Sequence, residues 1–106
     1  MQKLTDLKKL ENLDTSDVSF VGYVYDSRID ENNAMFTLIE EVEKSGIYAN
    51  CSFYDIDVTT LSDEDLELLP NYVPALMIYN ANSKTLAMAL GVKTKQEIIE
   101  FIGDHV

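Results

Sequence analysis

Cysteine and histidine are nearly absent from this sequence. Its 106 residues include one cysteine, Cys51, and one histidine, His105. A single thiol cannot form an internal disulfide bond, and no cluster of cysteines and histidines exists that could hold zinc. The sequence also lacks a glycine-rich phosphate loop, a Gly-X-Ser-X-Gly motif and a recognisable serine, histidine and aspartate set. We therefore expect no cofactor and find no recognisable catalytic pattern.

Basic residues are also scarce. The sequence has 8 lysines and arginines against 19 aspartates and glutamates, which gives a formal net charge of −11. Binding nucleic acid requires a positive surface that displaces phosphate counterions, so we expect no nucleic-acid partner. An anionic membrane surface would repel the chain for the same reason. Acidity of this kind usually keeps a small domain soluble, and a specific basic partner is the alternative interpretation.

Long hydrophobic runs are missing as well. The apolar runs are far shorter than the ~20 residues that a transmembrane helix needs. The segment 1–14 is charged throughout and lacks the apolar centre of a secretory signal. We therefore expect no membrane span and a cytoplasmic location. With 46% hydrophobic residues, the chain 1–106 has the size and composition of a single globular domain.

The first half of the chain predicts alternating helices and strands. Leucines at positions 4, 7, 10 and 13 recur every three residues and predict a short amphipathic helix over 3–13. The β-branched and aromatic run 18–25 predicts a strand that is buried on both faces. Apolar residues at helical spacing predict a helix over 31–45, and the run 50–58 predicts a second strand.

The second half predicts a short helix, a hairpin and a final helix. Ser62 opens a Ser-X-X-Asp pattern that is typical of a helix start. The runs 75–79 and 84–90, joined by Asn-Ala-Asn-Ser, predict a β-hairpin. Thr94 and Glu97 have the spacing of a capping box, which predicts a helix to the end of the chain. Parallel βαβ units followed by a hairpin give an α/β fold with a mixed sheet and helices on both faces.

Two segments carry a resemblance to a known family. The run "YVPALMIYN" precedes the hairpin, and "LGVKTKQEIIEFIGDHV" ends the chain. With the order of elements, they make the whole chain resemble a divergent member of the thioredoxin-like superfamily. The resemblance implies a three-layer α/β/α architecture with a mixed central sheet and a C-terminal β-hairpin plus helix. It also implies a cis peptide bond before Pro74.

The chemical groups of that family are missing at the corresponding positions. Its Cys-X-X-Cys motif falls on the four residues 28–31, Arg-Ile-Asp-Glu, so neither cysteine is present. The nucleophile of thiol exchange is a thiolate, which arginine and glutamate cannot replace. The buried acid and the lysine that the family also carries correspond roughly to Gly22 and Phe53. The resemblance therefore implies a redox-inactive domain, more consistent with a binding protein than with an enzyme.

Other polar residues near the predicted strand ends do not indicate a metal site. Asp55 and Asp57 alternate on one strand end, but no glycine lies nearby of the kind that a calcium loop needs. The segment "DSRIDENN" lacks that glycine as well. We expect Asp26, Ser27 or Asp30 to cap the helix that follows, because acids suit its positive end.

The function implied by the resemblance is binding of a protein or peptide partner. The backbone of Val73, before the proline, would pair with an extended peptide as an added strand. Arg28 could recognise a carboxylate, although a solvent-exposed pair with Asp30 or Glu31 is the simpler interpretation. The expected peptide-binding residues are Ser27, Arg28, Ile29, Val73, Pro74, Gly91 and Val92.

Two other classes of function stay open. One is an enzyme of unrecognised type, using Cys51 in monothiol chemistry or Arg28 with Asp30 as a binding pair. A lone cysteine in a strand is more often a small buried hydrophobic residue. The other is a structural or assembly subunit that makes contacts through the N-terminal leucines or through its six tyrosines. Most of these tyrosines fall in predicted strands, which favours core packing. The sequence does not define an oligomeric state.

Overall fold

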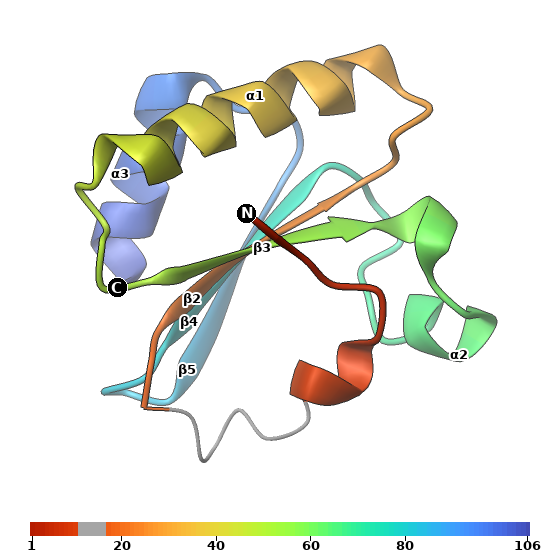
Figure 1. Cartoon of the computed structure of the whole chain (residues 1–106), viewed down its shortest axis with the longest axis horizontal. Helices are drawn as coiled ribbons and strands as arrows, with labels where there is room; N and C mark the ends of the chain where they lie inside the picture. The colour runs from red at the N-terminus through yellow and green to blue at the C-terminus, as the bar shows by residue number, and fades with distance from the viewer. Residues whose placement is uncertain (11–16) are drawn as a thin grey trace.

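A computed structural model describes residues 1–10 and 17–106 of this chain, and in this part five strands form one sheet (Figure 1). The strands are β1 (Gln2–Lys3), β2 (Phe20–Tyr25), β3 (Ser52–Asp57), β4 (Ala75–Asn80) and β5 (Thr85–Leu90). The helices are α1 (Asp30–Ser45), α2 (Asp63–Leu66), α3 (Lys95–His105) and the short 3-10 helices η1 (Leu7–Leu10) and η3 (Val58–Thr60).

The sheet is mixed, as the sequence predicts. Its strand order is β1-β3-β2-β4-β5. β1 and β2 both run parallel to β3, whereas β4 is antiparallel to β2 and to β5. All six residues of β2 are buried, which confirms the prediction of a central strand covered on both faces. The predicted α/β class with a C-terminal hairpin plus helix is confirmed.

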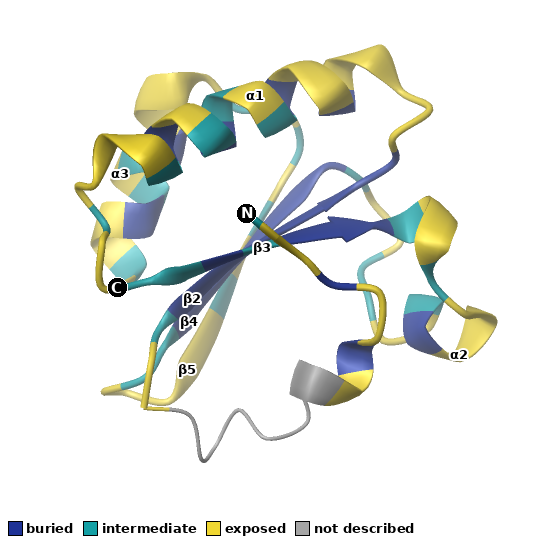
Figure 2. Ribbon diagram, viewed as in Figure 1, coloured by how far each residue is buried: buried dark blue, intermediate teal, exposed yellow. Residues whose placement is uncertain are grey.

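The helices divide between the two faces of the sheet. α1 and α3 lie on one face, and η1 and α2 lie on the other (Figure 1). The core under α1 and α3 includes Tyr23, Ile39 and Ile98, all fully buried. The core on the opposite face includes Leu4 and Ile56. Figure 2 shows buried residues along the sides of α1 and α3 that face the sheet. No helix in residues 1–10 and 17–106 is long and apolar enough to cross a membrane.

The helix predicted over 3–13 is present in the described residues only as the short 3-10 helix η1, and the prediction is wrong for residues 3–6. The chain begins with β1, whose two residues pair with β3, and only η1 is helical before residue 11. The Leu4 N–H donates to the Asp55 carbonyl at 2.8 Å, and the Leu7 N–H donates to Asp65 Oδ2 at 3.2 Å. Leu4 is therefore placed in the core by the pairing of β1 with β3, and Leu7 by η1 and its contact with Asp65. The end of the predicted helix, residues 11–13, lies outside the described residues.

The other predicted elements are confirmed, with their ends shifted by a few residues. The Ser62 hydroxyl accepts a hydrogen bond from the Asp65 N–H and begins α2, which is only four residues long. Thr94 and Glu97 form the expected capping box of α3. Gly46 ends α1 with φ at 77°, a left-handed conformation that glycine adopts without strain. These local signals were readable from sequence because each satisfies free backbone groups at a helix end.

The C-terminal helix also contains a close approach that limits substitution. The Tyr48 hydroxyl donates to the Ile99 carbonyl of α3 at 2.6 Å. Gly103 lies beside this hydroxyl, and a Cβ atom added there would be 2.9 Å from it. Without the hydroxyl, the nearest atom of the tyrosine ring would be 3.9 Å away, an ordinary contact. Gly103 thus leaves room for the hydrogen bond that ties the loop after α1 to α3.

This contact predicts a reversal of the usual effect of alanine in a helix. Replacing glycine by alanine inside a helix normally stabilises by about 1 kcal/mol. Gly103→Ala should gain little or lose stability in the wild type, since the new methyl group displaces the Tyr48 hydroxyl. In a Tyr48→Phe background the same change should recover the gain of about 1 kcal/mol. Urea unfolding of the four proteins measures both effects, and equal gains in the two backgrounds would contradict the contact.

Candidate functional site

The predicted site residues gather at one end of the sheet because of strand register. Tyr25 pairs with Asp57, and Val24 pairs with Ala75, which in turn pairs with Leu90. The turn after β2, the residues before β4 and the residues after β5 therefore meet at the same end. We call this surface the strand-end site, and its members are Ser27, Arg28, Ile29, Val73, Pro74, Gly91 and Val92.

Two members of the strand-end site are joined directly. The Gly91 N–H donates to the Pro74 carbonyl at 2.8 Å. Gly91 has φ at 96°, a conformation that favours glycine and lets the chain turn away from β5. The Val73–Pro74 peptide bond is cis. In the described part of the chain, the Val73 backbone makes no hydrogen bond in a turn, loop or cap.

Arg28 is held by an aspartate two residues before it. Its Nε donates to Asp26 Oδ1 at 3.0 Å and its Nη2 donates to Asp26 Oδ2 at 2.7 Å. The Arg28 backbone N–H also donates to Asp26 Oδ1, at 2.9 Å. The expectation that Arg28 pairs with Asp30 or Glu31 is therefore wrong. Asp30 and Glu31 lie in the first turn of α1, whereas the guanidinium folds back onto Asp26 in the turn after β2.

This pairing shifts the acid–base behaviour of Asp26. The hydrogen bonds from the Arg28 side chain and backbone, with the charge of the guanidinium, lower the pKa of Asp26 to about 2. The same hydrogen bond and charge raise the pKa of Arg28. Asp26 is buried while the Arg28 side chain is 77% exposed, so the ion pair lies at the surface with its acid inward. Two parallel N–H···O bonds make this the strong, orientation-specific form of the interaction.

The turn is fixed from its other side by α1. The Asp26 N–H donates to Asn32 Oδ1 at 3.0 Å, and the Tyr23 hydroxyl donates to the Asn32 carbonyl at 2.8 Å. Asn32 is 1% exposed, so its side chain is a buried connector between β2 and α1. The Asn33 side-chain amide donates to the Ser27 carbonyl at 2.8 Å. The turn therefore has little freedom to change shape.

A second acid organises the boundary between this turn and β3. Asp57 Oδ1 accepts hydrogen bonds from the Ser27 N–H at 3.3 Å, the Thr59 N–H at 3.1 Å and the Thr59 hydroxyl at 2.9 Å. Burial alone would raise the pKa of Asp57, but the hydrogen bonds from Ser27 and Thr59 outweigh burial and lower it. Asp57 is thus a structural carboxylate that joins the ends of β2 and β3.

None of the three expected residues caps α1. Ile29 occupies the cap position, and its side chain makes no hydrogen bond to the helix. Asp26 is taken by Arg28, and the Ser27 hydroxyl lies 3.4 Å from the Thr59 hydroxyl. Asp30 lies inside the first turn, where its charge suits the positive helix end. The prediction failed because the turn uses its polar side chains within itself and toward β3.

The positions of the family's proton-handling pair are apolar. A side chain at Gly22 would meet Met77 Cε at 3.2 Å and Ile56 Cδ1 at 3.5 Å, so the space is already filled. Phe53 is 4% exposed and belongs to the core under α1 and α3. Neither position could exchange a proton with a group at the start of α1.

The exposed part of the strand-end site is partly apolar. Ile29 is 41% exposed and Val92 is 54% exposed. Val73 is half-buried and packs against the core on the η1 face, and Pro74 is buried. The surface therefore combines two exposed aliphatic side chains, a backbone segment outside the regular sheet and one guanidinium.

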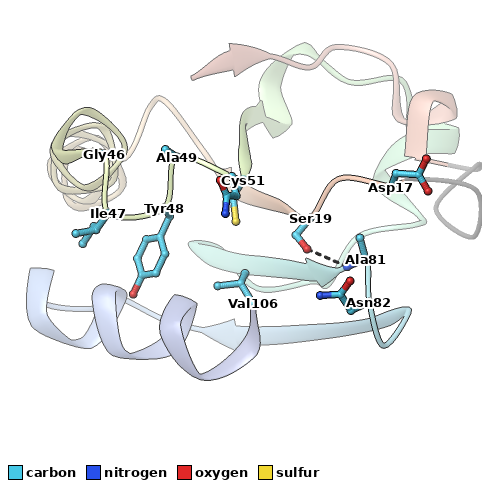
Figure 3. Close-up of a pocket in the computed structure, with 11 residues that line it drawn as sticks. Asp17, Ser19, Gly46, Ile47, Tyr48, Ala49, Cys51, Ala81, Asn82 and Val106 are labelled. Carbon is cyan, nitrogen blue, oxygen red and sulfur yellow. Dashed lines mark hydrogen bonds between the residues drawn. The ribbon is translucent and has the colours of Figure 1, made fainter.

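Cys51 lies far from this site. It precedes β3, at the end of the parallel strands opposite to Arg28, and six residues of strand span about 20 Å. It lines a cavity of about 500 Å³ together with Ser19, Tyr48 and Val106 (Figure 3). Burial raises the pKa of the Cys51 thiol, which reduces the fraction of reactive thiolate.

Metal-binding chemistry has no support in the described residues. No group of three or more histidine, cysteine, aspartate or glutamate side chains there could hold a metal ion. Asp55 and Asp57 lie two residues apart on β3, and Asp57 pairs with Tyr25 of β2. Burial raises the pKa of Tyr25, and the Asp55 and Asp57 carboxylates add to the rise. Asp55 Oδ1 is buried without a hydrogen-bond partner among the described atoms.

Comparisons with known proteins agree with this architecture. No family model and no curated protein matches the sequence. Among solved structures, chloroplastic thioredoxin z has a TM-score of 0.80 at 15% identity, over 98% of this chain and 92% of that protein. Mitochondrial thioredoxin 3 from Saccharomyces cerevisiae has a TM-score of 0.78 at 19% identity, and the match covers 98% of this chain and 94% of that protein. Plasmodium falciparum thioredoxin has a TM-score of 0.79 at 14% identity, and the match covers 100% of this chain and 100% of that protein.

The fold of this chain is therefore thioredoxin-like, as the sequence predicts. Identities this low establish the fold and leave the activity to be argued from the site. With a single cysteine, the chain cannot contain a Cys-X-X-Cys pair. The residues 28–31 that stand in place of that pair lie where β2 leads into α1.

The lowered pKa of Asp26 predicts a specific sensitivity to acid. A carboxyl group with a lower pKa in the folded than in the unfolded chain stabilises the fold above its unfolded value of about 3.9. That contribution is lost as the pH falls toward the folded value of about 2. The free energy of unfolding should therefore decrease more steeply between about pH 5 and about pH 2 in the wild type than in Asp26→Asn.

Urea titrations across this pH range measure the difference. Arg28→Gln should flatten the slope in part, because it removes the guanidinium hydrogen bonds and charge that lower the pKa of Asp26 but keeps the hydrogen bond from the backbone N–H of residue 28. Lys44→Gln removes the same charge from the far end of α1 and should keep the wild-type slope. Parallel curves for the wild type and Asp26→Asn would show that the ion pair does not form in solution.

Proposed function

We propose that this chain is a redox-inactive thioredoxin-like domain that binds an extended segment of a partner protein at the strand-end site. The observation that carries the proposal is the Asp26–Arg28 pair. It occupies the place where a dithiol would react and uses that place to fix the turn. The exposed side chains of Ile29 and Val92, and the backbone of Val73, remain available to a ligand.

Loss of thiol chemistry follows from the residues at the start of α1. Thiol exchange needs a thiolate whose pKa is lowered by a helix N-terminus or a nearby cation. Here the helix start has no cysteine, and the charge of Arg28, which precedes the cap residue Ile29, is balanced by Asp26. The remaining thiol, Cys51, has a raised pKa and lies at the other end of the sheet.

The binding step rests on backbone pairing and apolar contact. An extended peptide could pair with Val73 and place alternate side chains against Ile29 and Val92. Nε and Nη2 of Arg28 donate hydrogen bonds to Asp26. The two N–H groups of Nη1 can then donate to a carbonyl or carboxylate of the peptide. The net charge of −11 supports a protein ligand over a nucleic acid.

An insulin-reduction assay tests the loss of redox activity. The wild type should not accelerate reduction by dithiothreitol, and Cys51→Ser should behave in the same way. The double variant Arg28→Cys with Glu31→Cys should gain turnover, because it places a dithiol at the helix start where a thiolate is stabilised. Wild-type turnover that Cys51→Ser abolishes would establish a monothiol enzyme and refute the proposal.

Peptide binding can be tested without a known partner. Peptides are selected from a random display library on the immobilised full chain, and the affinity of the dominant peptide is measured by calorimetry. Ile29→Asp and Val92→Asp should each weaken binding about tenfold or more, since a buried charge opposes apolar contact. Substitution at these exposed positions should preserve the fold, whereas a charge at Val73 would disturb the core against which its half-buried side chain packs.

Ile47→Asp is the matched control for these variants. Ile47 is 57% exposed and follows the C-terminal end of α1, beside the cavity that Cys51 lines. Its substitution adds the same charge and should leave the affinity unchanged. If Ile47→Asp weakens binding while Ile29→Asp and Val92→Asp do not, the ligand binds at the opposite end of the sheet and the proposal is wrong.

A further inference from the structure

The β4–β5 hairpin differs in charge from the rest of the molecule. Residues 68–96 contain no aspartate or glutamate, although the chain has 19 of them. The same segment carries Lys84, Lys93 and Lys95. A strongly acidic domain therefore has one segment that is locally positive.

The hairpin also has an uncovered edge. β5 is the last strand of the sheet, and nothing in residues 1–10 and 17–106 pairs with its outer side as a strand. Its sequence, Thr-Leu-Ala-Met-Ala-Leu, contains neither charge nor proline. Proteins usually shorten or charge such edges to prevent pairing with other chains. The opposite edge follows this rule, because β1 is two residues long and contains Lys3. The β5 edge does not follow it, because β5 is six residues long and uncharged.

One face of β5 is apolar and exposed. Leu86, Met88 and Leu90 alternate along the strand, so they point to the same side of the sheet. Their exposed fractions are 50%, 41% and 48%, and Figure 2 shows β5 as mostly exposed. We call these three residues the β5 stripe. A run of exposed large apolar residues on an unpaired strand is typical of an interaction surface.

We propose that β5 is a docking edge for an extended segment of a partner protein that has apolar residues at alternate positions and acidic residues at both ends. The segment adds to the sheet as a strand beside β5, with backbone hydrogen bonds along the outer edge. Its apolar side chains pack next to the β5 stripe as cross-strand neighbours. Its acidic ends lie near Lys84 and Lys93.

The positions of the lysines fit this arrangement. Lys84 comes directly before β5, and Lys93 follows its last residue by three positions. Lys93 Nζ donates to the Leu90 carbonyl at 2.8 Å, which keeps this ammonium group beside the strand end. Lys95 is directed elsewhere, since its Nζ lies 3.3 Å from Glu41 Oε2 of α1. A lysine thus lies at each end of the edge, where its charge would attract an acidic residue of the ligand. Hydrogen bonds from Thr94 lower the pKa of Glu97 at the start of α3, and the charge of Lys93 also acts on that carboxyl group and lowers its pKa further.

A second copy of this chain fits the edge less well. Antiparallel pairing of two β5 strands would place Met88 opposite Met88 and Leu86 opposite Leu90. In that register Lys84 of one copy approaches Lys93 of the other at both ends, and like charges there are unfavourable.

Two labelled peptides test the docking edge on the full chain. One alternates valine and threonine and has two glutamates at each end, and the other has lysines in place of the glutamates. Fluorescence anisotropy should show that the glutamate-ended peptide binds about tenfold more tightly. Lys84→Glu combined with Lys93→Glu should reverse that preference. Equal binding of the two peptides to the wild type, or an unchanged preference in the double variant, would overturn the proposal.

Single variants locate the binding surface. Met88→Glu should weaken binding of the glutamate-ended peptide about tenfold, while Leu68→Glu, which adds the same charge at a residue that is 68% exposed, should not. Circular dichroism checks that both remain folded. Ile29→Asp should leave this affinity unchanged, so the result is independent of the strand-end site. Equal weakening by Met88→Glu and Leu68→Glu would contradict docking on β5.

Sedimentation equilibrium tests whether a second copy of this chain pairs with β5. The wild type should sediment as a monomer with or without Met88→Glu. A wild-type dimer that Met88→Glu dissociates would show that β5 pairs with a second copy, and the proposed partner segment would then be wrong.

Discussion

The turn between β2 and α1 is held by its own polar groups, and the character of the strand-end site depends on this constraint. Asp26 binds both the side chain and the backbone of Arg28, and Asn32 binds the backbone of Asp26. Asp57 holds Ser27 from the neighbouring strand. Burying a carboxylate costs free energy unless its oxygens are hydrogen-bonded, so the bonds to Asp26 and Asp57 favour one shape of the turn. What remains for the proposed ligand is backbone, apolar surface and the exposed side of the Arg28 guanidinium.

A thioredoxin-like scaffold without its dithiol retains the geometry that brings four strand ends together. In this chain Arg28, the first of the residues 28–31 at the corresponding position, forms an ion pair with Asp26, and Gly22 and Phe53 lie against or within the apolar core. The two proposed surfaces use different parts of the same sheet. The strand-end site presents the chain next to Pro74, and the β5 edge presents a whole strand within an acid-free segment. Both are suited to extended polypeptide, because both offer backbone groups that regular pairing leaves free.

Local signals made most of the fold predictable from sequence. The buried run of β2, the helical face of α1 and the Thr94–Glu97 capping box depend on neighbours in the chain, and each is where it was expected. The N-terminal helix was wrong because Leu4 and Leu7 meet β3 and α2, contacts between segments about 50 residues or more apart. The resemblance to the thioredoxin-like superfamily predicted that the site residues lie close together. In the structure the strand register brings them to the same end of the sheet. The partner of Arg28 was missed, although the Asp-X-Arg spacing in a turn was a usable signal.

The central claim is that the strand-end site, and not the thiol, is where this domain acts. The most direct measurement is a titration of the ¹⁵N-labelled chain with a library-selected peptide, followed by amide chemical shifts. We expect the largest changes at residues 27–29, 73 and 91–92, with little change around Cys51. Changes that centre on Cys51 and the cavity beside Ser19 and Tyr48, with the strand-end amides unmoved, would contradict the claim.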